Sequence, residues 1–91
     1  MNFDLTATVK ELNGKEAEKT LAEILAEFLG SETKGNTIKL YYWYNHLLKN
    51  KSLDLDDPDH VMLTELITNS ERLYVYIKGQ LLDALKKNKE S

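Results

Sequence analysis

The two histidines of this 91-residue chain, His46 and His60, are the side chains best able to exchange a proton near neutral pH. A general base needs a second group that orients it, and a metal ion needs several ligands. Neither histidine belongs to a pattern such as His-Glu-x-x-His, and the two fall in different expected helices. The sequence contains neither Gly-x-Ser-x-Gly nor a glycine-rich phosphate loop. We therefore expect a protein that is not an enzyme, with no catalytic residues and no cofactor.

The acidic segment from Asp54 to Asp59, with Glu65 after it, has part of the spacing of a calcium-binding loop. Counted from Asp54, acidic side chains stand at positions 1, 3 and 12. An EF-hand loop also needs a ligand at position 5 and glycine at position 6, where this chain has Pro58 and Asp59. The same residues fit a helix start, with Asp57 as N-cap and Pro58 at the first helical position. We expect a helix cap here and no metal site.

Four consecutive aromatic residues, Tyr41 to Tyr44, make up half of the aromatic side chains of the chain. In a helix, consecutive side chains point about 100° apart, so four of them surround the axis. A small domain can bury one broad stripe of a helix but hardly its full circumference. We therefore predict that Tyr42, Trp43 and Tyr44 include a partner-facing patch that promotes self-association, for example as a homodimer. The alternative is that neighbouring elements bury this helix nearly all round and the rings belong to the core.

Exposed rings can also stack on unpaired bases, but single-strand binders combine them with a basic groove. Only Lys39 and Lys49 flank the aromatic run, and the formal net charge is −3. The C-terminal lysines fit the negative end of a last helix better than a phosphate-binding arm; they are Lys86, Lys87 and Lys89. We expect no direct contact with nucleic acid.

Length and composition indicate a single globular domain, residues 1–91, with 42% apolar and 30% charged residues. The chain has no cysteine, which excludes disulfides and thiolate metal sites and fits a reducing compartment. Residues 1–4 lack the basic and then apolar pattern of a signal peptide, and the apolar runs are too short to span a membrane. These features predict a cytoplasmic protein that does not contact membranes.

The N-terminal third predicts a β-hairpin followed by a helix. Apolar and polar residues alternate over residues 3–9, as in a half-buried strand. Asn13-Gly14 favours a type I′ turn, which needs positive φ at both central positions, and residues 15–18 form a short returning arm. The helix should begin between about Ala17 and Thr20, with Thr20 and Glu23 as a candidate capping box, and end at Gly30 as a C′ glycine.

A second helix is expected over residues 37–49, capped by Asn36 or Thr37. Its apolar side chains fall into two stripes, which together form an unusually wide band. The first stripe consists of Ile38, Tyr41, Tyr42 and Asn45, and the second of Leu40, Trp43, Tyr44, Leu47 and Leu48.

A linker is expected over residues 50–56, with residues 53–56 as a short extended piece. A third helix should then start at Asp57-Pro58, and Asn69-Ser70 should cap a fourth helix from Glu71 to about Lys87. By propensity alone, residues 73–77 also suit a strand. We favour the helix because strong helix formers continue the same apolar face after them, despite Gly79.

The predicted fold is α+β and mostly helical, with an N-terminal β-hairpin packed on a cluster of about four helices. The expected core consists of Leu5, Val9, Leu21, Ile24, Leu25, Phe28, Ile38, Tyr41, Leu48, Leu66, Leu73, Ile77, Leu81 and Leu85.

The order of these elements resembles a group of small uncharacterised proteins encoded by bacteriophages and prophages. The resemblance is carried by four stretches, which are residues 12–16 (LNGKE), 33–39 (TKGNTIK), 53–59 (LDLDDPD) and 78–85 (KGQLLDAL). The chain departs from this pattern at Gly79, where alanine is expected, and in a less charged third helix. The resemblance implies a phage setting, inside a bacterial host cell, and carries over no functional residue.

These observations favour a small protein–protein interaction module, such as a phage accessory or assembly protein, whose aromatic helix meets a partner or a second copy. The alternative is an acidic regulator or inhibitor that binds a nucleic-acid-handling protein in place of its substrate. An enzyme of unknown type ranks third, because it would depend on a histidine without a companion.

Overall fold

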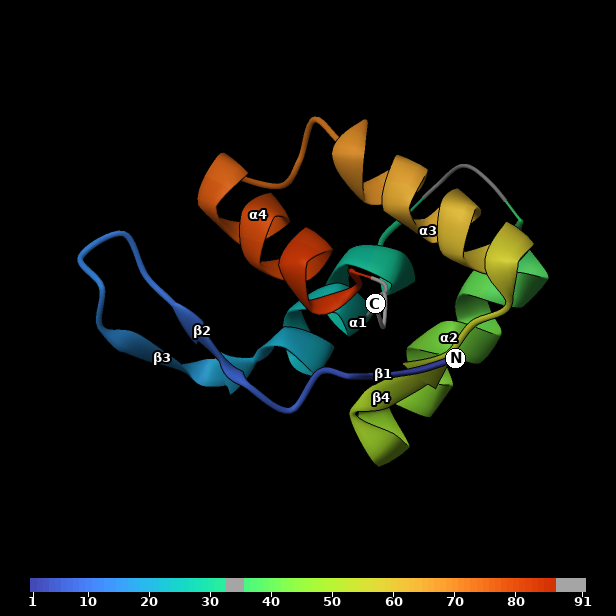
Figure 1. Ribbon diagram of the computed structural model, residues 1–91, viewed down its shortest axis with the longest axis horizontal. Helices are drawn as coiled ribbons and strands as arrows, with labels where there is room; N and C mark the ends of the chain where they lie inside the picture. Colours follow the sequence, from blue (N-terminus) through green and yellow to red (C-terminus); the bar gives the residue numbers. More distant parts are fainter. Residues whose placement is uncertain (33–35, 87–91) are drawn as a thin grey trace, which may run out of the picture.

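The computed structural model describes residues 1–32 and 36–86, and confirms the predicted α+β fold (Figure 1). The expectations for Lys87 and Lys89, and residues 33–35 of the stretch that carries the resemblance, lie outside these residues. None of the described helices is long and apolar enough to cross a bilayer. In chain order the elements are β1 (Asn2–Asp4), β2 (Thr8–Lys10), β3 (Glu16–Thr20), α1 (Leu21–Gly30), α2 (Thr37–Asn50), β4 (Ser52–Asp54), α3 (Asp57–Thr68) and α4 (Val75–Ala84).

The single first strand expected from the sequence is two strands with different partners. β1 pairs antiparallel with β4, Phe3 opposite Leu53, whereas β2 pairs antiparallel with β3 in the hairpin. The chain turns between β1 and β2 because the Asp4 carboxylate accepts hydrogen bonds from the N–H and the hydroxyl of Thr6, at 2.9 and 2.7 Å. Both bonds lower the pKa of Asp4, and the bond from the Thr6 hydroxyl has the larger effect. The short extended piece expected in the linker over residues 50–56 corresponds to β4.

The hairpin turn is longer than the predicted type I′ turn. The Glu11 N–H donates to the Lys15 carbonyl and the Gly14 N–H donates to the Glu11 carbonyl, both at 2.8 Å. Gly14 has a φ of 82°, while Asn13 does not have positive φ. This is the geometry of a three-residue loop that ends in a left-handed glycine. Asn13 contributes through its side chain, which accepts from the Lys15 N–H at 2.9 Å.

The capping box of α1 is present as predicted. The Thr20 hydroxyl accepts from the Glu23 N–H at 3.2 Å, and the Glu23 carboxylate accepts from the Thr20 N–H at 3.0 Å. Gly30, however, is the last residue of the helix and does not adopt positive φ. A Cβ on Gly30 would lie 2.9 Å from Cε1 of Tyr44. Glycine is therefore favoured here by the close approach of the Tyr44 ring of α2, and not by a left-handed cap.

Both later helix starts differ from the predictions. Asp56, not Asp57, is the N-cap of α3, and its carboxylate accepts from the Asp59 N–H at 2.9 Å. α4 begins at Val75 rather than Glu71 and ends at Ala84. The hydroxyl of Ser70 accepts from the N–H groups of residues 72 and 73, so it closes a turn between the helices instead of starting one.

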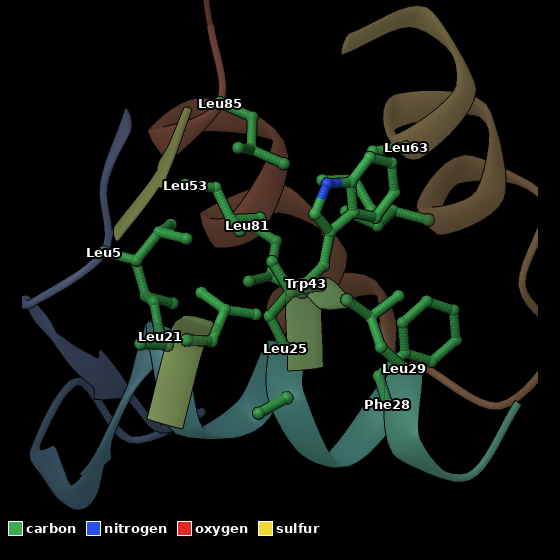
Figure 2. Close-up of a cluster of buried hydrophobic side chains, with 14 of the residues drawn as sticks. Leu5, Leu21, Leu25, Phe28, Leu29, Trp43, Leu53, Leu63, Leu81 and Leu85 are labelled. Atoms are coloured by element: carbon green, nitrogen blue, oxygen red, sulfur yellow. The ribbon is translucent and has the colours of Figure 1, made fainter. Parts of the chain in front are cut away.

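The core lies where α1, α2, α3 and α4 meet the N-terminal strands (Figure 2). Trp43 is at its centre and is only 2% exposed. Three residues expected in the core, Ile38, Tyr41 and Leu48, are exposed instead. Ile24, Leu66 and Leu73 are half-buried, and the rest of the expected core is buried. The buried residues outside that expected list are Phe3, Ala22, Ala26, Leu29, Leu40, Trp43, Leu47, Leu53, Leu55, Leu63 and Ile67.

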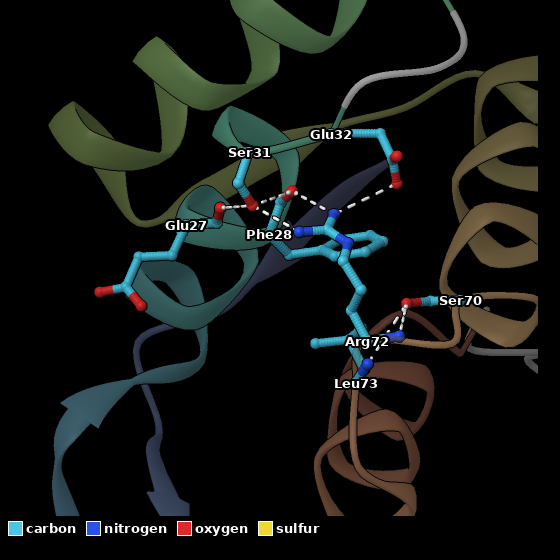
Figure 3. A network of polar contacts seen from close by, with 7 residues as sticks. All are labelled: Glu27, Phe28, Ser31, Glu32, Ser70, Arg72 and Leu73. Atoms are coloured by element: carbon cyan, nitrogen blue, oxygen red, sulfur yellow. Dashed lines mark hydrogen bonds and ion pairs between the residues drawn. The ribbon is translucent and has the colours of Figure 1, made fainter.

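Arg72, in the segment between α3 and α4, holds that segment against the end of α1 (Figure 3). Its guanidinium donates to the Ser31 hydroxyl at 2.6 Å, to the Phe28 carbonyl at 3.1 Å and to the Glu32 carboxylate at 3.3 Å. It also lies 4.9 Å from the centroid of the Phe28 ring. A cation at the C-terminal end of a helix is favoured by the helix dipole. This contact fixes α4 relative to α1.

Candidate functional site

The outer face of α2, which we define as Ile38, Tyr41, Tyr42, Asn45 and Leu48, is an exposed apolar surface. Its four apolar side chains are 83%, 66%, 65% and 54% exposed in sequence order. Their spacing of three, four and seven residues places them on one side of the helix. The opposite side carries Leu40, Trp43 and Leu47, all buried in the core. α2 is therefore apolar on two sides, of which the domain covers one.

Two ring stacks fix the tyrosines of the outer face. Tyr41 stacks on Tyr44 with ring centroids 6.4 Å apart, and Tyr42 stacks on His46 at 6.0 Å. Tyr44 itself rests against the backbone of Gly30, which has no side chain to displace it. Each exposed tyrosine of the outer face therefore lies against another ring of its own helix.

The outer face carries no charge along its centre. α2 contains no acidic residue, and one of its lysines, Lys39, pairs with Asp59 of α3 at 2.5 Å. That hydrogen bond raises the pKa of Lys39. Lys49 stands at the rim, in the last turn of the helix. An uncharged centre with a polar rim is the usual anatomy of a protein interface.

The predicted partner-facing residues separate in the structure. Tyr42 is exposed on the outer face, Tyr44 is half-buried beside Gly30, and Trp43 lies in the core. Trp43 cannot contact a partner while the domain is folded. Ile38, Tyr41 and Leu48 complete the surface. The sequence predicts these three residues in the core, although its helical spacing also places Ile38, Tyr41 and Tyr42 in one stripe.

Other exposed apolar side chains are more scattered. Leu12 is at the hairpin tip, Val61 is on α3, and Tyr74 and Val75 stand together at the start of α4. Tyr74 stacks on Tyr76 beside a shallow groove of about 380 Å³ between α1 and α4. These positions lie outside the outer face and are suitable for comparison with it.

The two histidines and residues of the acidic segment from Asp54 to Asp59 make contacts within the fold. His60 stacks on Phe3, with ring centroids 5.2 Å apart, and its Nε2 lies 2.6 Å from the Leu85 carbonyl oxygen. His46 stacks on Tyr42 and lies on a different helix from His60. Of the acidic segment, Asp56 caps α3 and Asp59 pairs with Lys39. Over residues 1–32 and 36–86, no three His, Asp or Glu side chains gather closely enough to hold a metal ion.

Comparison of the chain with protein-family models, with curated proteins and with solved structures gives no match.

Proposed function

We propose that this protein is a small, non-enzymatic interaction module that docks on other protein surfaces through the outer face of α2. The observation that carries the proposal is the exposure of Ile38, Tyr41, Tyr42 and Leu48 along one side of a helix whose other side is core. Aromatic residues at the centre of an apolar patch supply most of the binding energy at many interfaces. In the phage setting that the sequence resemblance implies, the module is an accessory or assembly protein.

The alternative, an acidic regulator of a nucleic-acid-handling protein, needs a free acidic surface. Many carboxylates of the described residues have local partners, which favours the interaction module. Glu23 and Asp56 cap helices, and Asp59, Glu27 and Glu32 pair with Lys39, Lys19 and Arg72.

Site-specific photocrosslinking in the cells that produce the protein tests the proposal. A photoreactive phenylalanine analogue at position 42 should give a discrete covalent adduct. The same analogue at position 74 should give none, since Tyr74 is also a stacked tyrosine, is 72% exposed, and lies outside the outer face. Adducts of equal yield from both positions, or none from position 42, would remove the outer face as a docking surface.

A further inference from the structure

We infer that the partner of the outer face is a second copy of this chain, bound with its α2 antiparallel to the first. This inference rests on the proposed function and names the occupant of the same surface. It follows from three properties of the outer face, which are its spacing, its charge and its area.

The spacing of the outer face is self-complementary. Ile38, Tyr41, Asn45 and Leu48 follow the three-and-four alternation of the contact positions of paired helices. A two-fold axis at the level of residue 43 places Ile38 opposite Leu48 of the second copy. It also places Tyr41 opposite Asn45 of the second copy, and the two remaining pairs follow by symmetry. Aliphatic side chains therefore meet at both ends of the interface.

The middle of this interface contains one amide on each helix. Asn45 Nδ2 donates to the carbonyl of Tyr41 in its own helix at 3.1 Å, which holds the side chain in place. Its Oδ1 can accept from the hydroxyl of Tyr41 of the second copy. A single polar residue in an otherwise apolar contact line disfavours other registers, because a shifted helix would bury the amide against aliphatic side chains.

The charges favour the antiparallel orientation. The centre of the outer face is uncharged, so two copies can meet there without burying an unpaired charge. Lys49 is at the rim near the C-terminal end of α2. In an antiparallel pair the two Lys49 side chains lie roughly 20 Å apart, and at this distance salt largely screens their repulsion. A parallel pair would bring them together and would align the helix dipoles unfavourably.

The area is sufficient for a reversible dimer. The four exposed apolar side chains present roughly 400–500 Å² per copy, counting a fully exposed tyrosine as about 200 Å². A symmetric pair can thus bury at most roughly 800–1,000 Å² of these side chains before rim residues are included, close to the ~1,000 Å² that specific interfaces need. We expect association in the micromolar range and not a permanent dimer.

Sedimentation equilibrium of the full chain from about 10 μM to about 1 mM measures this association. The mass should rise from one chain toward two, and Ile38→Lys or Leu48→Lys should weaken association at least about tenfold. The matched control is Val75→Lys, because Val75 is 84% and Ile38 83% exposed, each near the start of a helix. Val75→Lys should associate like the wild type. Since these positions are exposed, circular dichroism should show all the variants folded.

The absence of cysteine allows a direct test of the orientation. Chains with Ile38→Cys and with Leu48→Cys are mixed in equal amounts and oxidised. The antiparallel pair should give the mixed 38–48 disulfide well above the half expected for random pairing, and an excess of the 38–38 and 48–48 products would overturn the orientation. A wild type that stays monomeric up to about 1 mM would overturn the dimer. In that case a crosslink from position 42 to another protein would leave the proposed function standing, whereas no crosslink would end both.

Discussion

The side-chain amide of Gln80 forms two hydrogen bonds with the main chain of Lys10. They are the two bonds that a neighbouring strand would make. Gln80 Nε2 donates to the Lys10 carbonyl at 2.7 Å, and the Lys10 N–H donates to Gln80 Oε1 at 2.8 Å. One glutamine of α4 thereby satisfies the edge of β2 that faces away from β3. The contact joins residues 70 positions apart and docks the hairpin on α4.

Gln80→Ala should loosen the hairpin from the helices. Each lost hydrogen bond to a main-chain group costs about 0.5–1.5 kcal/mol, so we expect the free energy of unfolding to fall by about 1–2 kcal/mol. Amide hydrogen exchange should also show faster exchange at Lys10, which loses its acceptor. Asp83→Ala, at an exposed position of the same helix, is the control. Unchanged protection of Lys10 in Gln80→Ala would contradict the assigned contact.

Glycine to alanine changes should have opposite effects at two helical positions. Gly79 lies within α4, and a Cβ there would meet nothing within 4 Å. Gly79→Ala should therefore stabilise the protein by about 1 kcal/mol through helix propensity. Gly30→Ala places its Cβ 2.9 and 3.0 Å from ring atoms of Tyr44 and should destabilise by about 1 kcal/mol. Urea unfolding of both variants measures the two shifts, and stabilisation by Gly30→Ala would show that the Tyr44 ring moves away freely.

Lys51 ends α2 in the left-handed conformation, with φ 54° and ψ 32°. A residue with a Cβ is strained there by about 1–2 kcal/mol, part of which glycine recovers. Lys51→Gly should raise the free energy of unfolding by about 0.5–1 kcal/mol. Lys49→Gly, two residues earlier and within the helix, should lower it by about 0.5 kcal/mol or more. Thermal unfolding of the pair separates the conformational effect from the loss of a lysine.

The carboxylate of Glu23 should contribute to stability in neutral solution and lose that contribution in acid. Its pKa lies below the ordinary value, chiefly because the carboxylate accepts a hydrogen bond from the main-chain N–H of Thr20. A group whose folded pKa is lowered stabilises the fold above its unfolded pKa, about 4.3 for glutamate, and ceases to do so as the pH falls through the folded value. Glu23→Gln keeps an acceptor but does not titrate, so its stability should fall less steeply with acid. Urea midpoints measured from about pH 6 to about pH 3 compare the two. Parallel curves would show that the cap does not favour the ionised form.

The helices α1, α2 and α3 could be predicted from the sequence because each carries a local signal at its start, whereas α4 has no side-chain cap. The capping box of Thr20 and Glu23 and the cap at Asn36 are formed by contacts within a few residues. The proline at position 58 likewise marks the start of α3 to within one residue. The hydrogen bonds from Thr6 to the Asp4 carboxylate, which divide the expected first strand, are equally local, but the alternation of apolar residues concealed them.

Which side of α2 faces the core could not be predicted from periodicity, because both sides are apolar. Leu40, Trp43 and Leu47 satisfy the helical spacing as well as Ile38, Tyr41 and Leu48 do. The choice depends on what lies opposite: Gly30 of α1 leaves room for the Tyr44 ring, and Trp43 belongs to the same core cluster as Leu63. Contacts between distant residues, such as Arg72 with the end of α1, also carry no local signal.

The pairing of β1 with β4 has a consequence for the order in which the chain folds during synthesis. β2 and β3 are joined by a short turn, so their hairpin can form soon after residue 20 emerges from the ribosome. β1 must wait until residues 52–54 are made, with all of α1 and α2 in between. Until then the strand bearing Phe3 has an open edge that other nascent chains can pair with. Rapid formation of α1 and α2, followed by pairing with β4, therefore shortens the time for which the edge of β1 is open.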